Sequence, residues 1–313
     1  MQSLIANIID TAGNEAQYDA QSKRLMSMTE ILAWVLKTCV DEFKEFDVQF
    51  IMKNCFMGKP IVSQIAVDPD MPNRYVEAMN SEDMTIREHK IIYDVRFKVK
   101  VPRSNEIIEL IVDIEIQKDS SGIHYIIRRG IYYTSRMISA QFGAEFKDSH
   151  YEDIKKVISI WICPATANYR QDSIIEMSIK PSTIYGDFKV KDEDADVLRL
   201  IVIGLTDGES ENPIIRLLSV YLSADKTPED KKSILEKEFG IKMTEEMEKE
   251  VKKMYAMSEA LKEKTWEKAQ MHFAKKLLRT HQAIPYVANV SELSEEVVRE
   301  IADIVAKEEN GAE

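Results

Sequence analysis

The 313-residue sequence predicts a mixed α/β core followed by a helical C-terminal region. Three observations support this fold class. Residues 90–117 alternate between apolar and polar side chains around a "PRSNE" turn, which is typical of an antiparallel hairpin. Residues 124–142 change to helical spacing. Two nearly continuous apolar runs, residues 154–164 and 196–205, are typical of buried central strands.

The elements follow one another in an order that suits a mixed sheet. Residues 28–57 have apolar side chains at helical spacing, and Thr29 with Glu30 predicts the start of a helix. The hairpin, the helix of residues 124–142 and the first apolar run come next. An irregular segment, the second apolar run and a helix over residues 214–223 complete a predicted core of residues 28–223. Residues 224–313 are charged and helical in period, which predicts a helical appendage.

Composition restricts the function classes. A net charge of −12 argues against a protein that coats nucleic acid without specificity, because phosphate contacts require Lys and Arg. Basic residues nevertheless outnumber acidic ones between residues 86 and 170, which is compatible with a localised nucleic-acid site. The sequence has neither a basic leader nor an apolar stretch of the ~18–20 residues that a membrane span needs. Its three cysteines suit reduced, buried thiols, so we expect a cytoplasmic protein without a membrane partner.

The hairpin carries the residues whose side chains could take part in a reaction. Asp94 lies on its first strand, and Glu115 and Gln117 share one face of its second strand. A favourable register brings Asp94 within reach of Glu115. Carboxylate oxygens are the ligands that Mg²⁺ and Mn²⁺ prefer, and such an ion lowers the pKa of a bound water. The amide of Gln117 could orient that water.

This pattern of Asp, hairpin, Glu-x-Gln and helix resembles the PD-(D/E)xK nuclease superfamily. Within it, the sequence resembles the PD-(D/E)xK nuclease family transposases, also called Rpn or recombination-promoting nucleases. The matching blocks begin near Glu30 and include "IIYDVRFKV", "VDIEIQKD", "RRGIYYTSRMISAQF" and "YEDIKKVISIWIC". The resemblance implies a restriction-endonuclease-like mixed sheet flanked by helices. It also implies a DNA endonuclease that uses Mg²⁺ or Mn²⁺, with DNA as its partner.

The resemblance also implies roles for individual residues. Asp94 and Glu115 correspond to the metal ligands, the backbone carbonyl of Ile116 to a further ligand, and Gln117 to the position where the superfamily usually has lysine. Arg129, Tyr133, Arg136 and Gln141 fall in the family's helix block and are candidates for binding the scissile phosphate. The first three are spaced four and three apart, which places them on one stripe of a helix.

Alternatives remain open at each position. Glutamine has no charge to offer a phosphate, so the chain could instead be a catalytically inactive descendant that acts as a DNA-binding or protein-interaction scaffold. Asp94, Asp113 and Glu115 could be solvated charges on an exposed sheet face. The arginines could form ion pairs, and Tyr133 could be a packing residue. The last helix, "SEEVVREIADIV", is too acidic for a phosphate-lined groove, which favours a degenerate DNA-binding module or a homo-oligomer contact.

Overall fold

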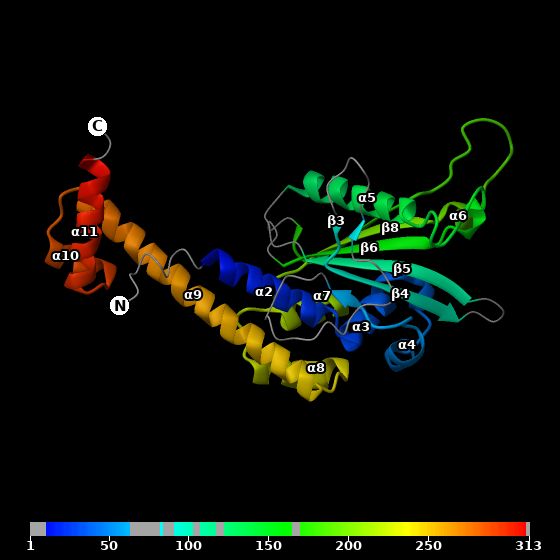
Figure 1. Ribbon diagram of the computed structural model, residues 1–313. Helices are drawn as coiled ribbons and strands as arrows, with labels where there is room; N and C mark the ends of the chain where they lie inside the picture. The colour runs from blue at the N-terminus through cyan, green and yellow to red at the C-terminus, as the bar shows by residue number, and fades with distance from the viewer. Residues whose placement is uncertain are drawn as a thin grey trace. The chain divides into compact units, whose positions relative to one another are not determined.

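The computed structural model describes residues 11–62, 82–83, 91–102, 107–116, 122–164 and 170–310. Their centre is a six-stranded mixed sheet in the order β1-β4-β5-β6-β8-β7 (Figure 1). The strands are β1 (Ile61–Val62), β4 (Val95–Pro102), β5 (Ile107–Ile116), β6 (Lys156–Cys163), β7 (Ser173–Ser178) and β8 (Leu198–Gly204). Two short strands, β2 (Glu82–Asp83) and β3 (Ile91–Ile92), pair separately.

The direction of the strands confirms the predicted mixed sheet. β4 and β5 form the expected antiparallel hairpin, with Val95 opposite Ile114 and Arg96 opposite Asp113. β6 then runs parallel to β5, and β8 runs parallel to β6. Every residue of β6 is buried, as its nearly continuous apolar sequence predicts. The predicted fold class, an α/β core with a helical C-terminal region, is therefore correct.

Helices cover both faces of this sheet. The helices before the last strand are α2 (Thr11–Met26), α3 (Thr29–Cys39), α4 (Val48–Asn54), α5 (Ile123–Ser139) and α6 (Asp192–Ala195), with short 3-10 helices η1 (Asp41–Phe43) and η2 (Tyr151–Asp153). After it come α7 (Pro213–Leu222), α8 (Pro228–Phe239), α9 (Glu245–Arg279), α10 (Ile284–Ser291) and α11 (Glu295–Asn310). α5 lies on one side of the sheet, and α3 and α7 lie on the other (Figure 1).

α5 packs closely on β6 and β8 because it has a glycine at the contact. Ile126, Tyr133 and Met137 of α5 form one buried cluster with strand residues that include Trp161. At Gly130 a Cβ atom would stand 2.6 Å from both terminal methyl groups of Leu200, so a larger residue there would require the Leu200 side chain to shift. The helix therefore covers the sheet face to which the buried cluster belongs, over β6 and β8.

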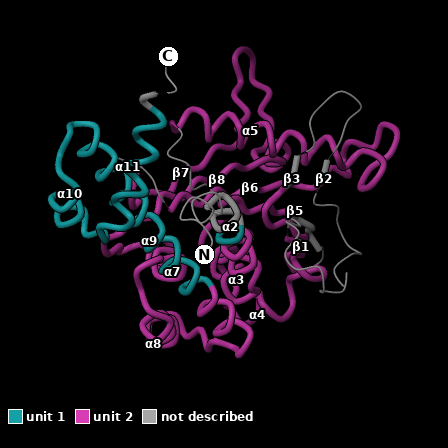
Figure 2. Tube along the Cα trace, turned by 60° about the vertical axis from the view of Figure 1, so that its left-hand side comes forward, with its two compact units in different colours: residues 1–18, 254–313 teal, residues 19–253 magenta. Residues whose placement is uncertain are grey.

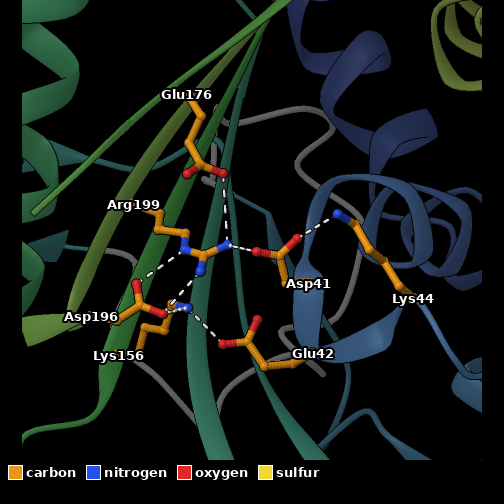
Figure 3. Close-up of polar contacts among 7 residues, drawn as sticks. All are labelled: Asp41, Glu42, Lys44, Lys156, Glu176, Asp196 and Arg199. Carbon is orange, nitrogen blue, oxygen red and sulfur yellow. Dashed lines mark hydrogen bonds and ion pairs between the residues drawn. The ribbon is translucent and has the colours of Figure 1, made fainter. Parts of the chain in front are cut away.

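A cluster of charged residues joins η1 to the starts of β6 and β8 (Figure 3). Lys156 forms ion pairs of 2.6 Å with both Glu42 and Asp196. Arg199 binds Asp41 at 2.6 Å and donates two hydrogen bonds to Asp196, at 3.0 and 2.9 Å. These contacts connect helical and sheet segments more than 100 residues apart in sequence.

The chain forms two compact units (Figure 2). One unit, residues 19–253, contains the sheet. It also includes α8 and the start of α9, so it extends past residue 223, where the sequence analysis placed the end of the core. The second unit comprises the described residues before Asp19 and those from Met254 onward. It has a core of its own around Ala274, Val298 and Ile301.

Two smaller predictions can also be compared with the structure. Cys39, Cys55 and Cys163 are free and buried, as predicted. Burial raises the pKa of Cys39 to about 12 and that of Cys163 to about 11, so both are protonated at neutral pH. Among the described helices, none combines the length and the apolar character that crossing a membrane requires.

Candidate active site

Asp94 and Glu115 meet at the end of the β4–β5 hairpin. The register that pairs Val95 with Ile114 places Asp94 opposite Glu115. The main-chain N–H of Asp94 donates to Glu115 Oε1 at 3.0 Å, and the N–H of Ile116 donates to Asp94 Oδ2 at 3.0 Å. Both acidic residues are buried, with exposed fractions of 8% and 4%. The alternative of solvated charges on an exposed face is therefore wrong.

Asp113 lies on the same side of β5 as Glu115 and is fully buried. Its Oδ2 accepts a hydrogen bond of 2.8 Å from Ser159, and Ser159 accepts one of 2.9 Å from the indole N–H of Trp161. The other oxygen, Oδ1, is buried without a hydrogen-bond partner in the part of the chain described. Asp113 is thus a member of the buried acidic group and not a surface charge.

The three carboxyl groups perturb one another. Burial raises the pKa of Asp94, of Asp113 to about 7, and of Glu115 well above its usual value. The charges of Asp113 and Asp94 raise the pKa of Glu115 further. Removal from water and mutual repulsion both disfavour the charged forms, so the anions depend on the hydrogen bonds from Ile116, Asp94 and Ser159 and on nearby cations.

One cation comes from α2, which sequence reasoning did not predict. Lys23 lies 2.7 Å from Asp94 Oδ1 and 2.8 Å from Asp19 Oδ2. Its side chain is only 11% exposed. Although burial lowers the pKa of Lys23, the charges of Asp94 and Asp19 outweigh that effect and raise it, so the side chain remains an ammonium ion.

A second cation comes from α5. Arg129 donates a hydrogen bond of 2.8 Å to the hydroxyl of Tyr133, and its guanidinium lies over the rings of Tyr133 and Trp161 at 5.0 and 5.2 Å. The charge of Arg129 opposes the rise in the pKa of Glu115, so the two side chains interact electrostatically. Two of the four phosphate candidates, Arg129 and Tyr133, therefore belong to the same site as the acids.

The other predicted residues lie farther away or outside the described residues. Arg136 is half-buried on α5, and seven residues of helix separate it from Arg129 by about 10 Å. The side-chain amide of Gln141 donates to the carbonyl of Lys155 and accepts from its N–H, both at 2.8 Å. Gln141 therefore links the turn after α5 to the main chain just before β6. Gln117 lies outside the described residues.

The donor atoms present fit a hard divalent cation in their chemistry. Asp94 and Glu115 face each other across the hairpin and offer carboxylate oxygens, and the buried carboxyl group of Asp113 lies on the same side of β5. Within the described ranges, however, no three His, Cys, Asp or Glu side chains form a ready-made metal cluster. The residues that could hold the ion are therefore Asp94, Glu115 and the carbonyl of Ile116.

Comparisons of the chain with protein-family models, with curated proteins and with solved structures give no significant match.

Proposed function

We propose that this chain is a metal-dependent DNA endonuclease of the transposase-associated, recombination-promoting type, and that it uses Mg²⁺ or Mn²⁺. The observation that carries the proposal is the meeting of Asp94 and Glu115 across the β4–β5 hairpin. Both carboxyl groups are buried, and two cationic side chains, Lys23 and Arg129, interact with them. Buried acids with raised pKa values and specific charge partners are typical of functional sites.

The proposed reaction is hydrolysis of a phosphodiester. Water adds to phosphorus, the bond to one ester oxygen breaks, and an alcohol and a phosphate monoester result. A divalent ion bound there would polarise the phosphate and lower the pKa of the attacking water. Asp94 and Glu115 would hold the ion. Arg129 would neutralise the charge that develops on the phosphate, and Tyr133 would keep the guanidinium in place through the hydrogen bond at its hydroxyl.

Nicking of supercoiled plasmid in the presence of Mg²⁺ or Mn²⁺ tests this function. We expect Asp94→Asn and Glu115→Gln, which keep the shape of each side chain, to slow nicking by about 100-fold or more. Glu193→Gln, which changes an exposed carboxylate, is the matched control and should nick at the wild-type rate. Equal nicking by all three variants would show that the hairpin acids do not carry the reaction.

A second candidate, a catalytically inactive scaffold, is favoured by one observation. Lys23 already neutralises Asp94, so the acidic pair has a counter-ion without a metal. Calorimetric titration with Mn²⁺ separates the two candidates. Saturable binding that Glu115→Gln abolishes supports the nuclease, whereas a protein that binds DNA but takes up no Mn²⁺ supports the scaffold.

A further inference from the structure

The proposed nuclease site needs a cation near the scissile phosphate, and the sequence has glutamine where the superfamily usually has lysine. In the described site, the ammonium group that contacts an acid of the hairpin is that of Lys23. Lys23 lies on α2, 71 positions before Asp94 in the chain. The contact therefore depends on tertiary packing and not on the hairpin.

The position of Lys23 is fixed from several directions. Asp19, one helical turn earlier, holds the ammonium group at 2.8 Å. The end of α2 is anchored to the core, because Leu25 is fully buried and its carbonyl accepts a hydrogen bond of 3.1 Å from the Tyr221 hydroxyl. Lysine is rarely this buried unless it is paired. A flexible surface lysine that happens to touch Asp94 does not fit these contacts.

We infer that Lys23 is the lysine of the active site, supplied by α2 instead of by β5. Its ammonium group neutralises Asp94 through Oδ1, an oxygen for which a bound metal ion would compete. When that oxygen is taken, the four-carbon stem of Lys23 allows the ammonium group to turn to a phosphate oxygen of the bound DNA. It remains charged throughout and transfers no proton. This inference rests on the proposed nuclease function.

Removal of Lys23 should change Mn²⁺ affinity and the nicking rate in opposite directions, because its ammonium group competes with the metal ion but assists the reaction. Without the positive charge of Lys23, the site repels a divalent ion less and Asp94 Oδ1 loses its ion-pair partner, so the affinity for Mn²⁺ should increase by about tenfold. Nicking at saturating Mn²⁺ should nevertheless slow by about 100-fold, because the phosphate loses its cation. A residue with a purely structural role would lower both quantities together.

The experiment compares Lys23→Met with Lys23→Arg and with a matched buried lysine. Mn²⁺ affinity is measured by calorimetry without DNA, and nicking is measured per folded molecule. Lys156 is the matched control, because it is 8% exposed and also pairs with two carboxylates. It faces Leu110 on β5, five residues or about 16 Å along the strands from Glu115. Lys156→Met should lower stability but change neither Mn²⁺ affinity nor nicking.

The outcomes separate this inference from the function on which it rests. Tighter Mn²⁺ binding with slow nicking in Lys23→Met, and partial recovery of nicking in Lys23→Arg, support it. A parallel loss of both, or no change in nicking, overturns it while wild-type nicking keeps the nuclease intact. If Lys23→Met does not fold, Lys23→Gln is measured in its place. A wild-type protein that neither binds Mn²⁺ nor nicks DNA overturns both proposals.

Discussion

Lys231 is a fully buried cationic side chain in the sheet-bearing unit. Its ammonium group donates a hydrogen bond of 3.1 Å to the main-chain carbonyl of Tyr221, and burial lowers its pKa from 10.5 to about 8. At neutral pH the folded protein therefore bears the cost of a buried charge. This residue makes the stability of the fold depend on pH independently of the acidic site.

The sign of that dependence follows from proton linkage. Between pH 8 and 10.5 the folded lysine is largely neutral while the unfolded lysine keeps its proton, so the contribution of Lys231 to stability rises with pH. We expect Lys231→Met to be more stable than wild type at pH 7, by at most about 3 kcal/mol, and the difference to shrink toward pH 10. Urea unfolding at a series of pH values measures it. A constant difference would contradict the assignment.

The site residues differ in how far the sequence could predict them. The alternation of the hairpin predicted Asp94 within reach of Glu115 given a favourable register, and the register of the structure places the two residues opposite each other. The same pattern left Asp113 ambiguous, because alternation separates two faces without telling which is covered. The contact with Lys23 could not be predicted, since it joins distant segments through packing.

At the scale of elements, Gly204 ends β8 at a close contact with the segment before β7. A Cβ atom on Gly204 would stand 1.9 Å from the carbonyl oxygen of Arg170, which is backbone and cannot move aside. We expect Gly204→Ala to lower the free energy of unfolding by about 2–3 kcal/mol. Gly208→Ala is the control, because its Cβ would meet its nearest neighbour, Thr206, at an ordinary 3.5 Å. Thermal denaturation of both variants measures the difference.

The charged cluster of Figure 3 should also stabilise the sheet. Arg199 is only 12% exposed and is bound by two aspartates, Asp41 and Asp196. Because both partners are more exposed than the arginine, we expect Arg199→Met to cost about 1–3 kcal/mol, below the range for a fully buried pair. Lys191→Met, which removes an exposed pair with Glu193, should change stability little. Equal effects in chemical denaturation would show that the cluster adds nothing.

Among the elements that the sequence did not predict, α2 and β7 have identifiable reasons. α2 was not predicted because its side chains lack a clear apolar stripe, and its buried residues include Gln21, Ser22 and Lys23. Hydrophobic periodicity cannot find a helix that packs through polar groups. β7 is a six-residue edge strand whose side chains are all partly or fully exposed, so it lacks the alternation of a half-buried strand. The hairpin and α5 had strong periods, β6 and β8 had nearly continuous apolar runs, and all were predicted correctly.

At the scale of the whole molecule, the two compact units have separate cores. Ile301 on α11 is 1% exposed and belongs to the C-terminal core. Ile301→Ala should destabilise that core by about 2–5 kcal/mol. We expect hydrogen exchange to accelerate in α10 and α11 and to stay unchanged in β5 and β6. Glu300→Ala on the same helix changes an exposed residue and serves as the control. Faster exchange throughout the sheet would contradict two separate cores.

The predicted role of the C-terminal helices in a homo-oligomer stays a prediction. Sedimentation of wild type and of a variant that lacks residues 254–313 would measure it. If the protein remains an oligomer without these residues, the contact between copies must lie elsewhere in the chain, and the prediction is wrong.

The hydrogen bond from the indole of Trp161 to Ser159, and from Ser159 to Asp113, has an optical consequence. Indole emission responds to nearby charge, so the fluorescence of this tryptophan should depend on the charge of the acidic residues to which it is connected by hydrogen bonds. With Trp34 and Trp266, the chain's two other tryptophans, replaced by phenylalanine, emission from Trp161 should shift when Mg²⁺ is added. The fluorescence of Trp161 would then report metal binding without nucleic acid or an added dye.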